Sequence, residues 1–199
     1  SLVVVATDGH RLARDSFDAE SSNVAAIVPN KTVKQLVDVL GLIDSETVRV
    51  KVSERGLEVG NEDYFLSSRL IEGRYPDWRR VLPTDLPQVF RLSSSQLIGA
   101  LNRASIVAVK DGVRLDVEGG SLSISAGTGD ESIDDGLEVE RVSGDRNISI
   151  GCCAPYLREA IESANAEQIE LRFADGTTAF QVAPVGSEDR FSVIMPMRL

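Results

Sequence analysis

The sequence contains few of the residues that build metal and catalytic centres: two cysteines and one histidine among 199 residues. Cys152 and Cys153 are neighbours, a geometry that is strained for a disulfide and that matches no zinc-ligand spacing. We therefore interpret them as small core residues of a reduced, cytoplasmic protein. His10 has no serine or cysteine motif beside it, and the sequence holds no Walker A loop. These absences predict a protein without metal, cofactor or catalytic activity.

Long apolar runs and a surplus of basic residues are also missing. No stretch approaches the roughly 20 apolar residues that a membrane-spanning helix requires. The net charge of −10 and the isoelectric point near 4.7 argue against a protein that binds specific DNA sequences. The opening residues, Ser1 to Ala6, include neither an initiator methionine nor the basic region of a signal peptide. We therefore expect a fragment of a longer protein or a chain trimmed at its beginning.

Three segments have the periodicity of amphipathic helices. In residues 31–40, Val33, Leu36, Val37 and Leu40 fall at positions i, i+3, i+4 and i+7. The second helix is expected over about 95–109 and the third over about 155–164. Each is followed by short alternating segments with turn residues between them, typical of antiparallel strands. These strands are expected at 47–52, 56–59 and 64–70, then at 113–117, 121–125 and 137–142, and last at 169–173, 178–182 and 191–195.

A unit of strand, helix and three strands therefore occurs three times, with helix starts near residues 31, 95 and 155. Two facing units would place two helices on one side of a curved sheet, which predicts an α+β fold. We expect residues 88–199 to form a complete domain of two units and residues 1–75 to be the second half of a preceding, incomplete domain. Residues 76–87 are then the linker, stiffened by Pro76, Pro83 and Pro87.

Three motifs are distinctive: Ala6–Ala13 (ATDGHRLA), Tyr75–Pro83 (YPDWRRVLP) and the terminal Val193–Leu199 (VIMPMRL). In this order and spacing they closely resemble the bacterial β sliding clamp family, the β subunit of DNA polymerase III. The family shows an ATDGHRLA-like strand end, an FPDYRRVLP-like linker and a chain ending in MPMRL. The resemblance spans the whole chain, and the family's first domain and the first half of its second are absent.

The resemblance implies the DNA-clamp fold: repeated β-α-β-β-β units with antiparallel sheets outside and helices on the inner face of a ring homodimer. Double-stranded DNA threads the ring without sequence specificity. Replicative and translesion DNA polymerases, the clamp loader and repair proteins dock through short linear peptides. An acidic outer face fits this role, because a protein that encircles DNA needs only weak local attraction on its inner wall.

The resemblance also assigns a hydrophobic peptide-docking pocket. Its matching positions are Thr7, Gly9, His10, Arg11, Leu12, Pro76, Arg80, Val81, Tyr156, Thr177, Ala179, Val193, Ile194, Met195, Pro196, Met197, Arg198 and Leu199. Independently, both methionines of the chain lie in its last five residues, and flexible thioethers suit a pocket that accepts several ligands. The alternative is that Met195 and Met197 are ordinary core residues at the end of an edge strand.

Candidate DNA-facing cations lie on the helical segments: Lys31, Lys34, Arg103, Lys110 and Arg158. A solvated surface explains each of them equally well, and any phosphate contact would be weak and salt-sensitive. Near the end of the second helix, Ile106 and Val107 are apolar residues that the internal core does not require. By resemblance they belong to the face that meets a partner subunit.

Two functions from different classes remain open. The chain is either a fragment of a DNA polymerase processivity factor or a free-standing clamp-like regulator that captures clamp-binding peptides without encircling DNA. Both require the same pocket, so the sequence does not separate them. A metal-dependent hydrolase built on Asp134, Asp135 and Glu138 is disfavoured, because these residues lie in loops without ligand spacing.

Overall fold

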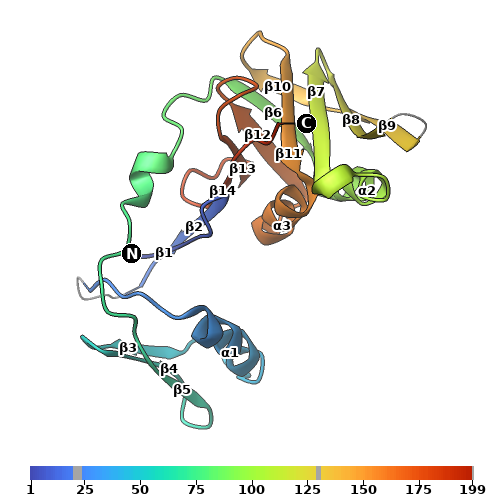
Figure 1. Cartoon of the computed structure of the whole chain (residues 1–199). Coiled ribbons are helices and arrows are strands. Elements are labelled where there is room, and N and C mark those ends of the chain that lie inside the picture. The colour runs from blue at the N-terminus through green and yellow to red at the C-terminus, as the bar shows by residue number, and fades with distance from the viewer. Residues whose placement is uncertain (20–23, 129–130, 199) are drawn as a thin grey trace. The chain divides into compact units, whose positions relative to one another are not determined.

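The computed structural model describes residues 1–19, 24–128 and 131–198, and it divides into two compact units (Figure 1). The first unit combines Ser1–Ala19 with Trp78–Leu199, and the second is Glu20–Asp77.

The first unit contains two antiparallel sheets. The seven-stranded sheet has the order β1-β2-β14-β13-β12-β6-β10, and the four-stranded sheet has the order β11-β7-β8-β9. The strands are β1 (Leu2–Thr7), β2 (Arg11–Phe17), β6 (Gln88–Ser93), β7 (Gly112–Glu118), β8 (Ser121–Thr128), β9 (Glu131–Glu138), β10 (Glu140–Ser143), β11 (Ile148–Cys153), β12 (Gln168–Phe173), β13 (Phe180–Pro184) and β14 (Phe191–Ile194). Two 3-10 turns, η1 (Trp78–Val81) and η2 (Val109–Asp111), complete the unit with helices α2 (Ser94–Ala104) and α3 (Ala154–Ala164).

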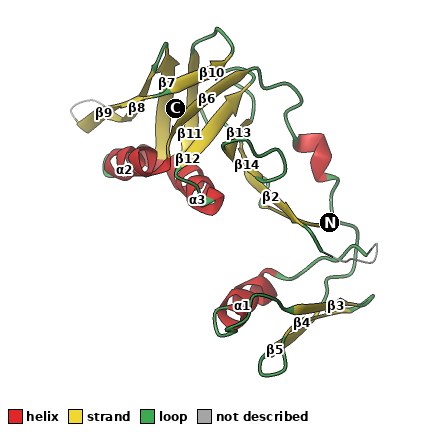
Figure 2. Ribbon diagram, turned by 180° about the vertical axis from the view of Figure 1, so that it is seen from behind, coloured by secondary structure: helices red, strands yellow, loops and turns green. Residues whose placement is uncertain are grey.

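Two copies of the predicted repeat make up most of this unit. The first copy is β6-α2-β7-β8-β9 and the second is β11-α3-β12-β13-β14. They exchange strands, since β6 pairs with β12 and β11 pairs with β7. Helices α2 and α3 lie side by side against the sheets (Figure 2). The predicted α+β fold of repeated units with antiparallel sheets is therefore confirmed.

The core of the first unit lies between these helices and the two sheets. Each helix buries one apolar face, and alternating strand residues meet it, as the periodicity of the sequence requires. Three phenylalanines from neighbouring strands fill its centre without any exposed surface: Phe90, Phe173 and Phe180. The ring centroid of Phe173 lies 6.1 Å from that of Phe90 and 5.1 Å from that of Phe180.

The second unit holds the helix and three following strands of the repeat: α1 (Asn30–Leu40), β3 (Arg49–Val52), β4 (Gly56–Gly60) and β5 (Phe65–Arg69). Residues 24–29, directly before α1, form no strand, so the predicted leading strand is not present there. Helix α1 packs against β4 and β5. Its predicted amphipathic stripe is present, but much of it stays outside the small core, because Val33 is 44% exposed and Val37 is 66% exposed.

Two predicted elements were wrong in their bounds. The helix expected over 95–109 ends at Ala104, because Ser105 donates its hydroxyl to the Leu101 carbonyl and Lys110 and Asp111 have positive φ angles that interrupt a helix. The strand expected over 137–142 is two strands in different sheets. The break falls at Val139, whose amide donates to the Gly120 carbonyl at 2.9 Å before the chain crosses to β6.

A charge ladder crosses three strands of the seven-stranded sheet. Arg91 on β6 contacts Glu140 on β10 at 3.3 Å and Glu170 on β12 at 3.2 Å. Arg172 contacts Glu170 at 2.8 Å. Burial alone would raise the pKa of the Glu170 carboxyl, but hydrogen bonds from Arg172 and Arg91 outweigh it and lower this pKa. Glu170 is only 7% exposed, so its two cation contacts are shielded from solvent.

Replacing Glu170 with glutamine is expected to lower the free energy of unfolding of the first unit by about 2 kcal/mol at neutral pH, because it leaves two arginines without their shared carboxylate. The folded-state pKa lies below the ordinary value of 4.5. The stabilisation is therefore present above that pH and is lost as pH falls through the folded-state pKa. Urea unfolding followed by Trp78 fluorescence measures it, with the exposed Glu167→Gln as control. A difference that persists unchanged in acid would contradict the ion-pair explanation.

Candidate functional site

The turn between β1 and β2 is fixed by its own polar side chains. One oxygen of Asp8 accepts hydrogen bonds from the amides of His10 and Arg11, both at 3.0 Å. The Thr7 hydroxyl accepts from the Gly9 amide at 3.2 Å and donates to the Arg11 carbonyl at 2.8 Å. Gly9 has a φ of +90°, which side chains rarely permit. The turn therefore presents His10 and Arg11 in defined positions.

An apolar floor lies where β2 joins β14. Leu12 and Val193 are directly opposite each other in the two strands, and both are buried. They form a small cluster with Trp78 and Leu82 from the linker and with Ala179 from the segment before β13. This cluster is separate from the main core, so it can form the base of a surface site.

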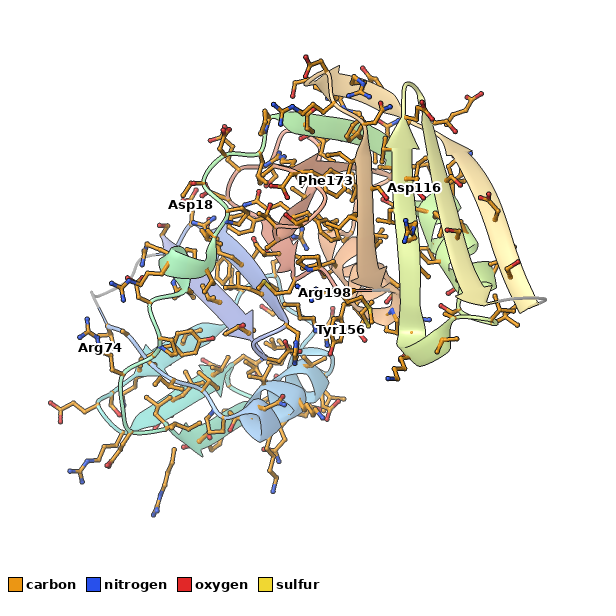
Figure 3. All side chains as sticks on the ribbon, turned by 45° about the horizontal axis from the view of Figure 1, so that its top comes forward. Asp18, Arg74, Asp116, Tyr156, Phe173 and Arg198 are labelled. Carbon is orange, nitrogen blue, oxygen red and sulfur yellow. The ribbon has the colours of Figure 1, made fainter. Side chains whose placement is uncertain are left out.

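The segment after β14 extends the site beyond the sheet. The Met195 amide donates to the His10 carbonyl at 2.9 Å, and the Met197 amide donates to the Gly151 carbonyl at 2.9 Å. The two bonds tie the tail to the β1–β2 turn and to β11. Met195 is 47% exposed and Met197 is half-buried. Figure 3 shows Arg198 of the tail and Tyr156 of α3 beside the end of β11.

Arg11 lies over the ring of Tyr156, with its guanidinium carbon 4.3 Å from the ring centroid. Its nitrogens contact Glu159 on α3 at 2.5 Å and Asp8 at 3.0 Å. Burial acts to lower the pKa of Arg11, but the bonds to Glu159 and Asp8 raise it, so the guanidinium stays charged. The ring of His10 stacks on Tyr156 with a centroid separation of 6.4 Å. Cation, carboxylates and aromatic rings thus form one edge of the site.

The loop between β12 and β13 is held by Asp175. One of its oxygens accepts from the Thr177 amide at 2.7 Å, from the Thr177 hydroxyl at 2.9 Å and from the Thr178 amide at 2.8 Å. These bonds lower the pKa of the Asp175 carboxyl. Gly176 approaches β11 so closely that a Cβ atom there would lie 2.1 Å from the Ser149 carbonyl oxygen. Asp175 and Gly176 therefore determine the position of Thr177.

Most residues predicted for peptide docking belong to the first unit. Arg80 and Val81 lie in η1, and Val81 is 57% exposed. Pro76 belongs to the second unit, and Leu199 lies outside the described residues. The roles of these residues in docking stay a prediction. Asp8, Glu159 and Asp175 were not predicted, because their part depends on contacts made only in the folded chain.

The candidate DNA-facing cations are divided between the two units. Lys31 and Lys34 lie on α1 of the second unit, and the other three lie in the first. Arg103 is paired with Asp135 at 2.6 Å, and Arg158 contacts Glu162 at 3.8 Å. Ile106, assigned by resemblance to a subunit face with Val107, is 82% exposed.

A cavity of about 280 Å³ lies on the other face of β2, beside α3. Its lining includes Ala6, Ala13 and Ala160 and none of the residues predicted for docking. Successive side chains of a strand point to opposite faces, so Leu12 and Ala13 belong to different surfaces. Within residues 1–19, 24–128 and 131–198, no group of three histidine, cysteine or acidic residues is placed to hold a metal ion. No helix in that part of the chain is long and apolar enough to cross a membrane.

Two family models match successive parts of the chain. The model for the central domain of the DNA polymerase III beta subunit covers residues 1–77. The model for its C-terminal domain covers residues 79–198.

Curated relatives and solved structures agree with these models. The beta sliding clamp of Proteus mirabilis is 31% identical over 202 residues, and that of Salmonella typhimurium is 32% identical over 203. Each alignment covers all of this chain and 55% of the relative, so the chain spans about half the length of these proteins.

Among solved structures, the DNA polymerase sliding clamp from Pseudomonas aeruginosa superposes with a TM-score of 0.90 at 28% identity, covering 99% of this chain and 55% of that one. Caulobacter crescentus pol III beta gives 0.88 at 30% identity, with 99% and 54% coverage. On the two family models, which together span nearly the whole chain, this protein belongs to the DNA polymerase III beta subunit family.

Proposed function

We propose that this chain acts as part of a DNA polymerase processivity factor, a sliding clamp that tethers its partners to DNA by binding their short peptides. The observation that carries the proposal is the junction of β2 with β14. There the apolar floor of Leu12 and Val193 meets the tail of Met195 and Met197 and the edge made by Arg11 and Tyr156.

This surface has the chemistry that peptide capture requires. Apolar side chains of a peptide gain free energy by covering the partly buried Trp78, Leu82 and Ala179 around the floor. They also cover the exposed thioether of Met195, which adapts to different shapes. Arg11 and His10 offer polar contacts at one edge, where an extended peptide needs hydrogen-bonding partners. The combination favours binding of several related peptides over binding of one rigid ligand.

The proposed peptide partners are replicative and translesion DNA polymerases, the clamp loader and repair proteins. The proposed nucleic-acid partner is double-stranded DNA, held without sequence specificity. Two of the five candidate cations, Arg103 and Arg158, already contact acidic side chains, so their attraction to phosphate is reduced. Weak attraction suits a protein that slides. The proposal includes no catalytic step and places the protein in the cytoplasm.

The subunit face is a separate part of this proposal. The Ile106 side chain, just after the end of α2, is almost fully exposed to solvent, and Val107 beside it is half-buried. An apolar side chain exposed to this degree is suited to burial in an assembly. We assign both residues to contact with a partner subunit in the ring homodimer of the full-length form.

Fluorescence anisotropy with a labelled peptide of the Gln-Leu-x-Leu-Phe type tests the docking site. The intact chain is expected to bind it with a dissociation constant in the micromolar range, and the chain ending at Ile194 is expected to lose binding, because the truncation removes both methionines. The control peptide has alanine in place of its leucines and phenylalanine. Equal binding of both peptides, or binding that survives truncation, would contradict the assignment.

A further inference from the structure

The candidate docking surface depends on a short strand pairing. Strands β2 and β14 pair over four residue pairs, from Arg14 opposite Phe191 to Arg11 opposite Ile194. Successive side chains of a strand point to opposite faces, so a shift of β2 by one residue would turn Leu12 away from the apolar floor. The surface therefore exists in only one register of these two strands.

Two ion pairs lie at the end of this pairing, across from the tail. The Nη1 atom of Arg14 contacts the Asp189 carboxylate at 2.7 Å and also donates to the Asp189 carbonyl. The Nε atom of Arg190 lies 3.3 Å from the Asp15 carboxylate, and its Nη2 atom donates to the Ser163 carbonyl of α3 at 2.8 Å. Arg14, Asp15, Asp189 and Arg190 thus form a polar clasp across the two strands.

The polar clasp holds the strands together on both faces of the sheet. Arg14 follows Leu12 by two positions and therefore lies on the face of the apolar floor. Its guanidinium carbon is 5.8 Å from the ring centroid of Phe191, which belongs to the same cluster as Leu12. Asp15 and Arg190 lie on the opposite face, where Arg190 reaches α3.

The order of the charges in the polar clasp matches only the observed register. Continuing that register by one residue brings Asp15 opposite Arg190. A shift of β2 by one residue in one direction would bring Arg14 opposite Arg190 and Asp15 opposite Asp189. Like charges directly opposite each other destabilise a strand pair. A shift in the other direction would place Asp15 opposite Phe191 and separate both ion pairs.

We propose that the polar clasp fixes the register of β2 on β14, and that its four members are positioning residues of the peptide-docking surface. They act at the end of the pairing away from Met195, whose amide donates to the His10 carbonyl at 2.9 Å. The effect on peptide binding rests on the proposed function, whereas the effect on the register does not.

The surroundings of the polar clasp make its contribution larger than that of an ordinary surface ion pair. Exposed pairs usually contribute little, because solvent and salt screen them. The Arg14 side chain, however, is only 13% exposed, and the two ion pairs share the junction with hydrogen bonds to two backbone carbonyls. The Asp189 side chain is 76% exposed, so replacing it leaves neither a cavity nor a buried group without a partner.

Asp189→Arg in the 199-residue chain tests the proposal, with fluorescence anisotropy of a labelled Gln-Leu-x-Leu-Phe type peptide as the first measurement. The substitution places two cations together at the junction, so affinity for the peptide is expected to fall roughly tenfold. Hydrogen exchange is the second measurement. The Met195 amide is expected to exchange faster, because its bond to the His10 carbonyl requires the observed register. The double variant Arg14→Asp with Asp189→Arg restores opposite charges in exchanged positions, and it is expected to return affinity to within about threefold of the wild-type value.

Glu140→Arg is the matched control. It reverses a similarly exposed charge, 63% against 76%, and breaks the contact with Arg91 on β10, at the far edge of the same sheet. Peptide affinity and Met195 exchange are expected to stay at their wild-type values. If Asp189→Arg changes neither measurement, or if the double variant recovers neither, the proposal is overturned. A wild-type chain that binds no peptide would contradict the proposed function, and Met195 exchange in the same variants would still decide whether the polar clasp fixes the register.

Discussion

Replacing Met197 with aspartate is expected to abolish peptide docking while leaving the fold intact. The Met197 side chain is half-buried at the end of the tail, and its amide anchors the tail to Gly151. Aspartate keeps this backbone bond. It places a carboxylate where an apolar peptide side chain would be buried, and an unpaired charge there is strongly unfavourable. We expect affinity for the peptide to fall by at least about a hundredfold, the effect of losing a central interface residue.

Anisotropy titration of the Met197→Asp protein measures this loss, and its Trp78 fluorescence unfolding curve checks the fold. Val142→Asp is the matched control, because Val142 is 44% exposed on β10, at the opposite edge of the seven-stranded sheet from β1. The control is expected to bind peptide normally. If a well-folded Met197→Asp protein retained its affinity, the tail would not be part of the docking surface.

The largest expected effect on stability is that of Phe173→Ala. Phe173 has no exposed surface and lies between two other phenylalanines of the core. Its removal leaves a cavity that the surrounding strands cannot close, since both flanking rings are fixed in their own strands. We expect the free energy of unfolding of the first unit to fall by about 3–5 kcal/mol.

Urea unfolding followed by tryptophan fluorescence isolates this effect, because Trp78 is the one tryptophan of the sequence and belongs to the first unit. Phe17→Ala is the control. Phe17 is 49% exposed at the end of β2 in the same unit, and its removal should change stability by less than about 0.5 kcal/mol. A loss for Phe173→Ala no larger than that of the control would mean that the aromatic cluster is not the centre of the core.

Periodicity predicted the helices well where side chains alone decide them. Helices α1 and α3 begin one residue before their expected starts and end where expected. The end of α2 could not be predicted, because it depends on the Ser105 hydroxyl and on two residues with positive φ. Periodicity also identified the apolar face of α1, but a repeating pattern indicates only that one side of the helix is apolar. Whether another element covers that face depends on the tertiary structure.

The candidate site divides in the same way. The family resemblance assigned Thr7, Gly9 to Leu12 and Val193 to Leu199 to one site. The structure pairs β2 with β14, which brings the described parts of these segments together. Sequence reasoning missed Glu159, which lies 148 residues from Arg11 along the chain and contacts it only because α3 packs near β2. It also missed Asp175, whose hydrogen bonds to Thr177 and Thr178 exist only in the folded loop. Contacts of this kind carry no local signal.

The register of β2 against β14 also determines when the candidate docking surface can form. Leu12 and Val193 come from segments near opposite ends of the 199 residues. Such a long-range pairing closes a large loop and is made late in folding. During synthesis the β1–β2 hairpin is made long before β14, so a surface that needs both is complete only after β14 has been made. The proposed docking surface therefore cannot form on a chain that lacks β14.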